Sequence, residues 1–293
     1  MSARFPLYIE SEIAMTRETV LITGCSSGIG RATAIEAHRR GHRVVATARN
    51  PARLEDLPAE MLKLQLDVDD TASIAAAIRE ATDATGGITA VVNNAGFGQI
   101  GAIEPVGVER IEAQFATNVF GPFRVANAVL PQMRRAGYGT IVNISSVMAY
   151  MSFAYYGIYC ASKSALWALS DAYRVEVAQF GVRVVQIECG TFKTEFIPKC
   201  TVLGEELIEE LEGGEFAGYY TGMRNTVDQG SPTEKLAAEP ELVARLNIDC
   251  IESASPKARY RVGNFTVKLA PYLLPFMPSS LMDKLTKKAL DIR

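Results

Sequence analysis

Tyr159 and Lys163 are the residues of this 293-residue chain best suited to acid–base chemistry. They stand four residues apart in a predicted helix over 157–180, so both side chains share one face of it. A phenol has an ordinary pKa near ~10, and a nearby ammonium group lowers that pKa by favouring the phenolate. Such a pair can protonate an alkoxide or deprotonate an alcohol. The spacing also arises by chance on protein surfaces, so its meaning depends on its surroundings.

A second group of residues is suited to holding a phosphate. The run Thr23-Gly24-Cys25-Ser26-Ser27-Gly28-Ile29-Gly30 lies between a predicted strand over 19–23 and a predicted helix that begins at Ile29. Glycines at such a turn let a pyrophosphate approach the backbone, and the free N–H groups at the helix start favour the anion. The alternative is a plain glycine-rich turn. Because strand and helix both flank it, we interpret the run as a dinucleotide site.

The end of the next strand predicts which dinucleotide binds. Folds that prefer NAD place an acidic residue there, about 20 residues after the glycine turn, to accept from the ribose 2′-hydroxyl. This chain has Ala48 at that place, followed by Arg49, whose guanidinium can grip a 2′-phosphate. Ser26 can add a hydroxyl donor. The alternative is that Arg49 is an ordinary surface charge, but the missing acid and the adjacent base together predict NADP(H).

Composition excludes several other classes of function. The net charge of −3 gives no electrostatic footprint for nucleic acid. With two histidines and five scattered cysteines that form no CxxC pair, we expect no metal site and reduced thiols in a cytoplasmic protein. Charges within 1–18 argue against a secretory signal. The uncharged stretch 136–162 is rich in Gly, Ser, Asn and Tyr, so we expect no integral membrane segment.

Short apolar runs alternate with helical patterns along the chain. Strands are predicted at 19–23, 43–47, 62–66, 88–92, 140–144, 182–187 and 260–262. Helices are predicted from Ile29 to before Gly41 and at 71–85, 108–135 with a break near Asn118, 157–180, 239–251 and 281–290. This order predicts an α/β fold, a doubly wound, Rossmann-like and mostly parallel sheet with helices on both faces. We expect one domain over 18–293 after an N-terminal tail, 1–17.

The pattern loosens after residue 190, where we expect a substrate lid over about 198–232. An apolar helical stripe carries six glutamates around it, interpreted as a solvated face, and glycines then punctuate a segment expected to be mobile. The residues expected to give the lid an apolar surface are Leu203, Leu207, Phe216, Tyr219, Tyr220 and Met223. The apolar tail over 272–277 is expected to line the same pocket.

Six motifs follow one another in an order that resembles the short-chain dehydrogenases/reductases. They are TGCSSGIG at 23–30, NNAG at 93–96, NVFG at 118–121, ISS at 144–146, YCASK at 159–163 and CGTFKT at 189–194. The glycine motif, VVATAR, YCASK, IECG at 187–190 and RYRVG at 259–263 are most similar to the 17β-hydroxysteroid and retinol dehydrogenase branch. One departure is Cys189-Gly190, where the family usually has Pro-Gly.

The resemblance implies roles for individual residues. Ser146, thirteen residues before Tyr159, matches the serine that binds the substrate oxygen, and Asn118 matches the asparagine that bends a helix and holds a water for a proton relay. With Tyr159 and Lys163 these are the implied catalytic residues. The cofactor contacts, implied by the resemblance together with the reading of the glycine turn and of Arg49, are Gly24, Ser26, Ser27, Gly28, Ile29, Gly30, Arg49, Asp67, Val68, Asn94, Ala95, Gly96, Tyr159, Lys163, Gly190 and Thr194.

The expected activity is NADP(H)-dependent interconversion of an apolar secondary alcohol and its ketone, steroid-like or of similar bulk. Alternatives left open are a retinoid, fatty-carbonyl or secondary-metabolite ketoreductase, and a regulator that binds NADP without catalysis. The intact Ser146, Tyr159 and Lys163 argue against the regulator. Cys160, beside Tyr159, lacks a base partner and is expected to be a packed thiol. The helices over 108–135 and 157–180 often form dimer contacts in the family, so a homodimer or homotetramer is expected.

Overall fold

A seven-stranded parallel sheet forms the centre of the computed structural model, which describes residues 17–215, 217–229, 237–263, 269, 272–273 and 276–290. The strand order is β3-β2-β1-β4-β5-β6-β7. The strands are β1 (Thr19–Ile22), β2 (Arg43–Ala48), β3 (Leu62–Gln65), β4 (Ala90–Asn93), β5 (Gly139–Ser146), β6 (Val182–Cys189) and β7 (Arg259–Val262). The expected doubly wound fold is confirmed.

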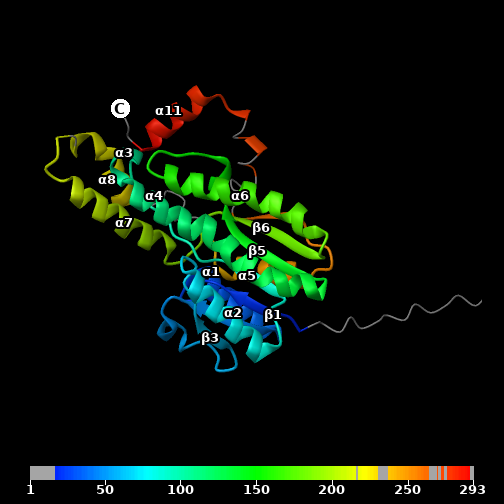
Figure 1. Ribbon diagram of the computed structural model, residues 1–293. Helices are drawn as coiled ribbons and strands as arrows, with labels where there is room; N and C mark the ends of the chain where they lie inside the picture. The colour runs from blue at the N-terminus through cyan, green and yellow to red at the C-terminus, as the bar shows by residue number, and fades with distance from the viewer. Residues whose placement is uncertain are drawn as a thin grey trace, which may run out of the picture.

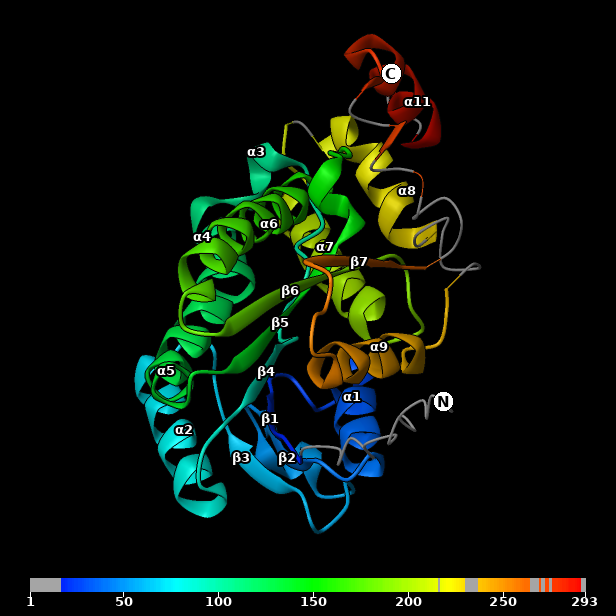
Figure 2. The same cartoon turned by 90° about the vertical axis from the view of Figure 1, so that its right-hand side faces the viewer.

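Helices cover both faces of this sheet (Figure 2). One face carries α1 (Gly28–Arg39) and α9 (Glu241–Glu252). The other carries α2 (Thr71–Thr85), α4 (Val108–Phe115), α5 (Gly121–Ala136) and α6 (Gly157–Ala178). The remaining described helices are α3 (Ile103–Val106), α7 (Phe196–Leu211), α8 (Thr221–Gln229) and α11 (Ser279–Leu290), with short 3₁₀ turns at Pro51–Leu54, Val147–Tyr150 and Ala217–Tyr220.

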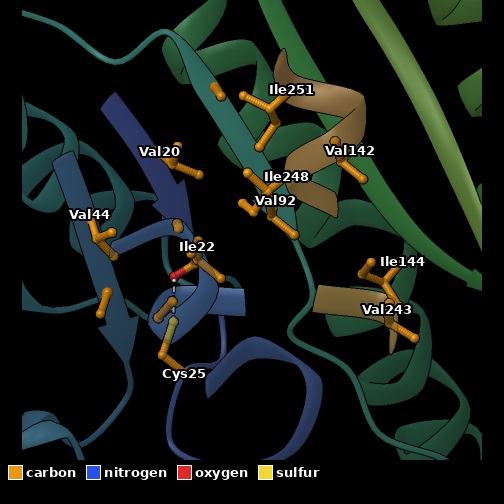
Figure 3. Close-up of a cluster of buried hydrophobic side chains, with 14 of the residues drawn as sticks. Val20, Ile22, Cys25, Val44, Val92, Val142, Ile144, Val243, Ile248 and Ile251 are labelled. Carbon is orange, nitrogen blue, oxygen red and sulfur yellow. Dashed lines mark hydrogen bonds between the residues drawn. The ribbon is translucent and has the colours of Figure 1, made fainter. Parts of the chain in front are cut away.

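Helices on both faces bury the strands. Because successive side chains point to opposite sides of the sheet, neighbouring residues of one strand enter different cores. Val20 and Ile22 of β1 join the core beneath α1 and α9, whereas Leu21 between them joins the core beneath α2 and α5. Figure 3 shows Val20 and Ile22 in the first core together with Ile248 and Ile251 of α9. Two packed layers of helices therefore hold the strand ends in fixed positions.

A third apolar cluster lies outside the sheet and joins the predicted lid region to the segment after β4 and to the start of α6. Its buried members are Ile100, Val106, Tyr155, Ile158, Cys200, Leu207, Ile208, Met223 and Val227. Gly204 of α7 allows α8 to approach, since a Cβ there would lie 2.7 Å from a methyl group of Val227. Within the segment expected to be mobile, Ala217–Gln229 forms a 3₁₀ turn and α8 and buries Met223 completely, while its mobility stays a prediction.

Where the apolar tail is described, its large side chains are mostly exposed, and its expected place beside the substrate stays a prediction. Tyr272, Leu273 and Phe276 are exposed, and Tyr272 stacks on Arg261 of β7, with the guanidinium carbon 4.5 Å from its ring centroid. Leu290, further along, is the tail residue that packs against the third cluster. Phe216 and the side chains of Tyr219 and Tyr220 fall outside the described residues, so their expected place in the lid has no counterpart here.

Two further findings concern groups expected to be absent. Among the described residues, no helix has the length and hydropathy needed to cross a bilayer. The same residues contain no cluster of three or more histidine, cysteine or acidic side chains arranged to hold a metal ion. All five cysteines, including Cys160, are free and buried.

Candidate active site

The carboxyl ends of the parallel strands bring the predicted site residues to one edge of the sheet. The chain leaves β1 toward β2 on one side, and β4 pairs with β1 on the other. Ligands of open α/β sheets bind at this kind of switch point. The glycine turn follows β1, the Asn94 loop follows β4, Ser146 ends β5, and the Thr194 segment follows β6.

The glycine turn has a backbone that only glycine adopts easily at two of its positions. Gly24 and Gly28 have φ of +74° and +57°. Gly30 is required by space, because a Cβ there would overlap the amide nitrogen of the Asn94 side chain and the carbonyl oxygen of Gly24. Asn94 Nδ2 donates to the carbonyls of Thr23 and Gly24, at 2.9 and 3.2 Å. The turn and the loop after β4 therefore form one unit, a cradle that fits a dinucleotide.

Replacing Gly30 with alanine is expected to weaken cofactor binding at least tenfold and to destabilise the fold by about 1–3 kcal/mol. The added methyl group must displace Asn94 or the turn itself. Titration with NADPH and thermal unfolding measure the two effects. Gly218→Ala is the matched control, since a Cβ there has open space. If Gly30→Ala bound NADPH as the wild type does, the cradle would be in the wrong place.

Thr23 is a positioning residue that the sequence analysis did not single out. Its Oγ1 accepts from the backbone N–H groups of Asn94 and Ala95, both at 3.0 Å. These bonds fasten the end of β1 to the loop after β4. The motif letters TG were visible in the sequence, but the partner loop lies about 70 residues away, so no local pattern pointed to it.

Ser146, Tyr159 and Lys163 are brought together by β5 and α6. Ser146 hydrogen-bonds to Tyr159, accepts from Met148 N at 3.1 Å and lies 3.4 Å from the carbonyl oxygen of Cys189. Lys163 is buried, and its Nζ donates to Ile144 O at 2.9 Å and lies 5.8 Å from the centroid of the Tyr159 ring. Ser145 Oγ, by contrast, is buried without a partner among the described residues.

Burial favours the neutral form of both titratable groups of this site, Tyr159 and Lys163. It raises the pKa of Tyr159 well above its ordinary value, against the opposing effect of the Ser146 hydrogen bond. It lowers the pKa of Lys163 to about 8. In the cofactor-free chain, burial therefore favours the protonated phenol of Tyr159.

The pH dependence of stability tests the burial of Lys163. Below about pH 8 the folded chain holds a buried ammonium group, which costs stability. This cost disappears as the pH rises from about 8 toward the ordinary value of 10.5, because the unfolded chain then binds more protons. Between pH 7 and pH 10, the stability of the wild type relative to Lys163→Met is expected to rise by about 2–3 kcal/mol. Urea unfolding of both cofactor-free proteins measures this difference, and a constant difference contradicts it.

Asn118 sits in a π-helical turn, Ala116–Phe120, between α4 and α5, where the sequence predicts a break. Its side chain is buried and accepts from Phe97 N at 3.1 Å while Nδ2 donates to Phe97 O and to Ser162 Oγ. Both side-chain groups thus hold the loop after β4, and Nδ2 also reaches α6, the helix that carries Tyr159. The implied role of Asn118 in holding a water stays a prediction.

The residues expected at the adenosine side lie near the ends of β2 and β3. Ala48 is buried at the end of β2, whereas the next residue, Arg49, is exposed and has no hydrogen-bond or ion-pair partner in the described part of the chain. Asp67 Oδ1 accepts from Asp69 N at 3.0 Å. Val68 packs closely on Gly121: a Cβ added to Gly121 would lie 2.9 Å from the Val68 side chain. Arg49 is thus free to meet an anion.

The remaining expected cofactor residues line the other side of the turn. Ser26, Ser27, Gly28 and Thr194 line one cavity of about 1080 Å³. A Cβ on Gly28 would lie 3.0 Å from Thr194, so the segment after β6 touches the turn directly. The others lie as follows: Ile29 packs on the first core, Gly96 is exposed beside Asn118, and Gly190 N donates to Val262 O.

Sequence reasoning missed a group of charged residues at Ser27. Glu195 hydrogen-bonds to Ser27 and forms ion pairs with Lys199 at 2.8 Å and Arg53 at 3.7 Å. The Lys199 ammonium holds the pKa of Glu195 below its usual range. Sequence reasoning also missed Phe196, whose ring centroid lies 5.5 Å from that of Tyr159. Except for the local pair of Glu195 with Lys199, these contacts join segments far apart in the sequence, so local spacing carries no signal for them.

Comparison with known proteins agrees with this geometry. Residues 18–201 match the family model described as short chain dehydrogenase. Human 17-beta-hydroxysteroid dehydrogenase type 1 is 33% identical over 259 residues, which cover 84% of this chain and 77% of that protein. The 3-ketodihydrosphingosine reductase of Bacteroides thetaiotaomicron is 31% identical, covering 92% and 96%. A solved short-chain dehydrogenase from Streptomyces avermitilis superposes with a TM-score of 0.73 at 30% identity, covering 94% and 97%. The chain therefore belongs to the short-chain dehydrogenase family, and is an oxidoreductase by that membership.

Proposed function

We propose that the protein is an NADP(H)-dependent reductase and dehydrogenase that interconverts an apolar secondary alcohol and its ketone. The observation that carries this proposal is the grouping of Ser146, Tyr159 and Lys163 at the same carboxyl edge of the sheet as the glycine turn. When bound, NADP(H) supplies or accepts the hydride. Gly24, Gly28 and Gly30 would hold its pyrophosphate, and Arg49 with Ser26 its 2′-phosphate.

The chain's own residues manage the proton. In reduction, Tyr159 gives its proton to the substrate oxygen as negative charge develops there. Ser146, already hydrogen-bonded to Tyr159, donates to the same oxygen and holds it in line with the phenol. The buried ammonium of Lys163 stabilises the phenolate left behind. Asn118 keeps the Phe97 loop and α6 in register, so these groups stay aligned.

An apolar substrate of steroid-like bulk is supported by the surroundings of Tyr159. Phe196 lies against its ring and against the third apolar cluster, which includes Leu207 and Met223. We assign α7 and α8 as the cover of the substrate, within the predicted lid over 198–232. A long-chain lipid ketone is the second candidate, favoured by the similarity to the bacterial 3-ketodihydrosphingosine reductase.

A head-to-head or side-by-side dimer of this chain fits the exposed faces of α4 and α6, which carry Val108 and Val175.

NADPH consumption against a panel of ketones tests the proposal. The panel runs from small diketones through steroid ketones to long-chain 3-keto lipids, each measured with NADPH and with NADH. The expected result is a higher kcat/KM for bulky apolar ketones and for NADPH. Turnover confined to small polar ketones would contradict the assignment of the substrate class, and equal use of NADH would contradict that of the cofactor.

A further inference from the structure

The C-terminal segment exposes large apolar side chains to an unusual degree. The exposed residues are Leu269, Tyr272, Leu273, Phe276, Leu281 and Leu285. Phe276 is 85% exposed, the largest value among the large apolar side chains of the described residues. Single exposed apolar residues are ordinary, but several within about twenty positions mark an interaction surface. Figures 1 and 2 both place this segment at the end of the molecule opposite α2.

Helix α11 shows how this exposure arises. Met282, Thr286 and Leu290 are spaced four residues apart and half-buried, and Leu290 reaches the third apolar cluster. Leu281 and Leu285 form a neighbouring stripe that remains 44% and 50% exposed. The helix thus docks on the protein by one stripe and leaves a second apolar stripe uncovered.

The charges next to this surface are positive, although the chain as a whole carries −3. Helix α11 has Lys284, Lys287 and Lys288 against a single acid, Asp283. None of these three lysines forms an ion pair within the described ranges. Exposed leucines flanked by lysines are the pattern of a helix that lies in the interface of an anionic bilayer.

A cavity of about 750 Å³ beside the same segment is also basic. It is lined by Arg174, Lys257, Ala258, Arg259, Tyr260, Arg261 and Tyr272. Two acids compensate part of this charge. Asp171 pairs with Arg259 and Arg174, and the fully buried Glu188 pairs with Arg261. Four basic side chains against two acids leave an excess of positive charge that suits phosphate groups. Tyr272 connects the cavity to the exposed apolar residues.

We propose that the C-terminal segment and this basic cavity form a docking surface for an anionic lipid bilayer. The leucines and Phe276 would enter the boundary between headgroups and acyl chains, and the lysines and arginines would meet lipid phosphates. Tyr272, amphipathic and placed between the two, suits the headgroup level. Leu290 links the docked helix to the cluster that borders Phe196 and Tyr159. If the proposed function holds, an apolar ketone dissolved in the bilayer meets the protein at the end that covers its active site.

Sedimentation of the full-length protein with vesicles tests docking without any assay of activity. The vesicles are phosphatidylcholine alone, or phosphatidylcholine with 30% phosphatidylglycerol. The wild type is expected to bind the anionic vesicles at least tenfold more tightly at low salt, with a smaller difference in 0.5 M salt. Wild-type protein that stays with neither vesicle, or binds both equally, overturns the proposal.

Paired variants separate the apolar and the charged contributions. Leu273→Ser/Phe276→Ser and Lys287→Gln/Lys288→Gln are each expected to weaken binding to anionic vesicles about tenfold or more. The matched controls are Tyr138→Ser/Leu242→Ser, at residues 45% and 42% exposed before β5 and on α9, and Arg79→Gln/Arg135→Gln on α2 and α5. The controls are expected to bind as the wild type does. Equal losses of vesicle binding in variants and controls overturn the proposal. A change in sedimentation coefficient without lipid, confined to Leu273→Ser/Phe276→Ser, also overturns it, because it would identify a second copy of the chain as the partner.

Discussion

Replacing Tyr159 with phenylalanine is expected to lower kcat for ketone reduction about 1000-fold while leaving the Kd for NADPH within about twofold. The substitution removes only the hydroxyl that hydrogen-bonds to Ser146 and keeps the ring that packs against Phe196. A loss of this size corresponds to about 4 kcal/mol of transition-state stabilisation, the range expected for a positioned proton donor. Steady-state kinetics and NADPH fluorescence titration measure the two quantities.

Tyr173→Phe is the control for this experiment. Tyr173 lies on the same helix, and its hydroxyl donates to Asn127 Oδ1 at 2.8 Å, away from the proposed site. Its kcat and KM should match those of the wild type. Near wild-type turnover in Tyr159→Phe would remove the tyrosine from the reaction, and parallel losses in both variants would assign the effect to α6 as a whole.

Replacing Arg49 with alanine is expected to raise KM for NADPH about 10- to 100-fold with little change in kcat, and to leave KM for NADH unchanged. A charge-assisted contact between a guanidinium and the 2′-phosphate accounts for a difference of this size, about 1.5–3 kcal/mol. Adding Ala48→Asp should then turn the preference toward NADH, because a carboxylate at the end of β2 accepts from the ribose 2′-hydroxyl and repels the phosphate. The kcat/KM ratio for the two cofactors is the measurement.

Arg43→Ala provides the matched loss of charge at the opposite end of the same strand. Arg43 donates to Thr85 O at the other edge of the sheet, so the cofactor ratio should not change. Arg49→Ala tested alone guards against misfolding caused by an acid at the buried position of Ala48. An unchanged ratio in Arg49→Ala would show that Arg49 is a surface charge without a role in cofactor selection.

The strands and the glycine turn are the parts of this molecule that its sequence predicts best. Runs such as 43–47 and 182–187 are rich in β-branched residues, so each predicted strand lies within two or three residues of the observed one. The turn is equally clear because Gly24 and Gly28 need positive φ and Gly30 needs space. These are local requirements, and a local pattern can carry them.

Other parts depended on contacts that the sequence does not display. The hydrogen bonds of Thr23 to the Asn94 loop and of Glu195 to Ser27 follow from the order of the strands. Helix α8 was missed because its sequence is polar and contains Gly222, and its position depends on packing against Gly204 of α7. The composition of the tail predicted burial, but composition does not state which surface an apolar residue meets.

Transfer of deuterium from the cofactor to the substrate tests the central claim most directly. NADPH labelled with deuterium at the transferring position of the nicotinamide is incubated with the ketone that turns over fastest, and the alcohol is analysed by mass spectrometry. The account predicts an alcohol one mass unit heavier, labelled at the carbinol carbon, from the wild type and from Tyr173→Phe, and at least a hundredfold less from Tyr159→Phe. An unlabelled alcohol, or labelled alcohol formed equally by Tyr159→Phe, would contradict it.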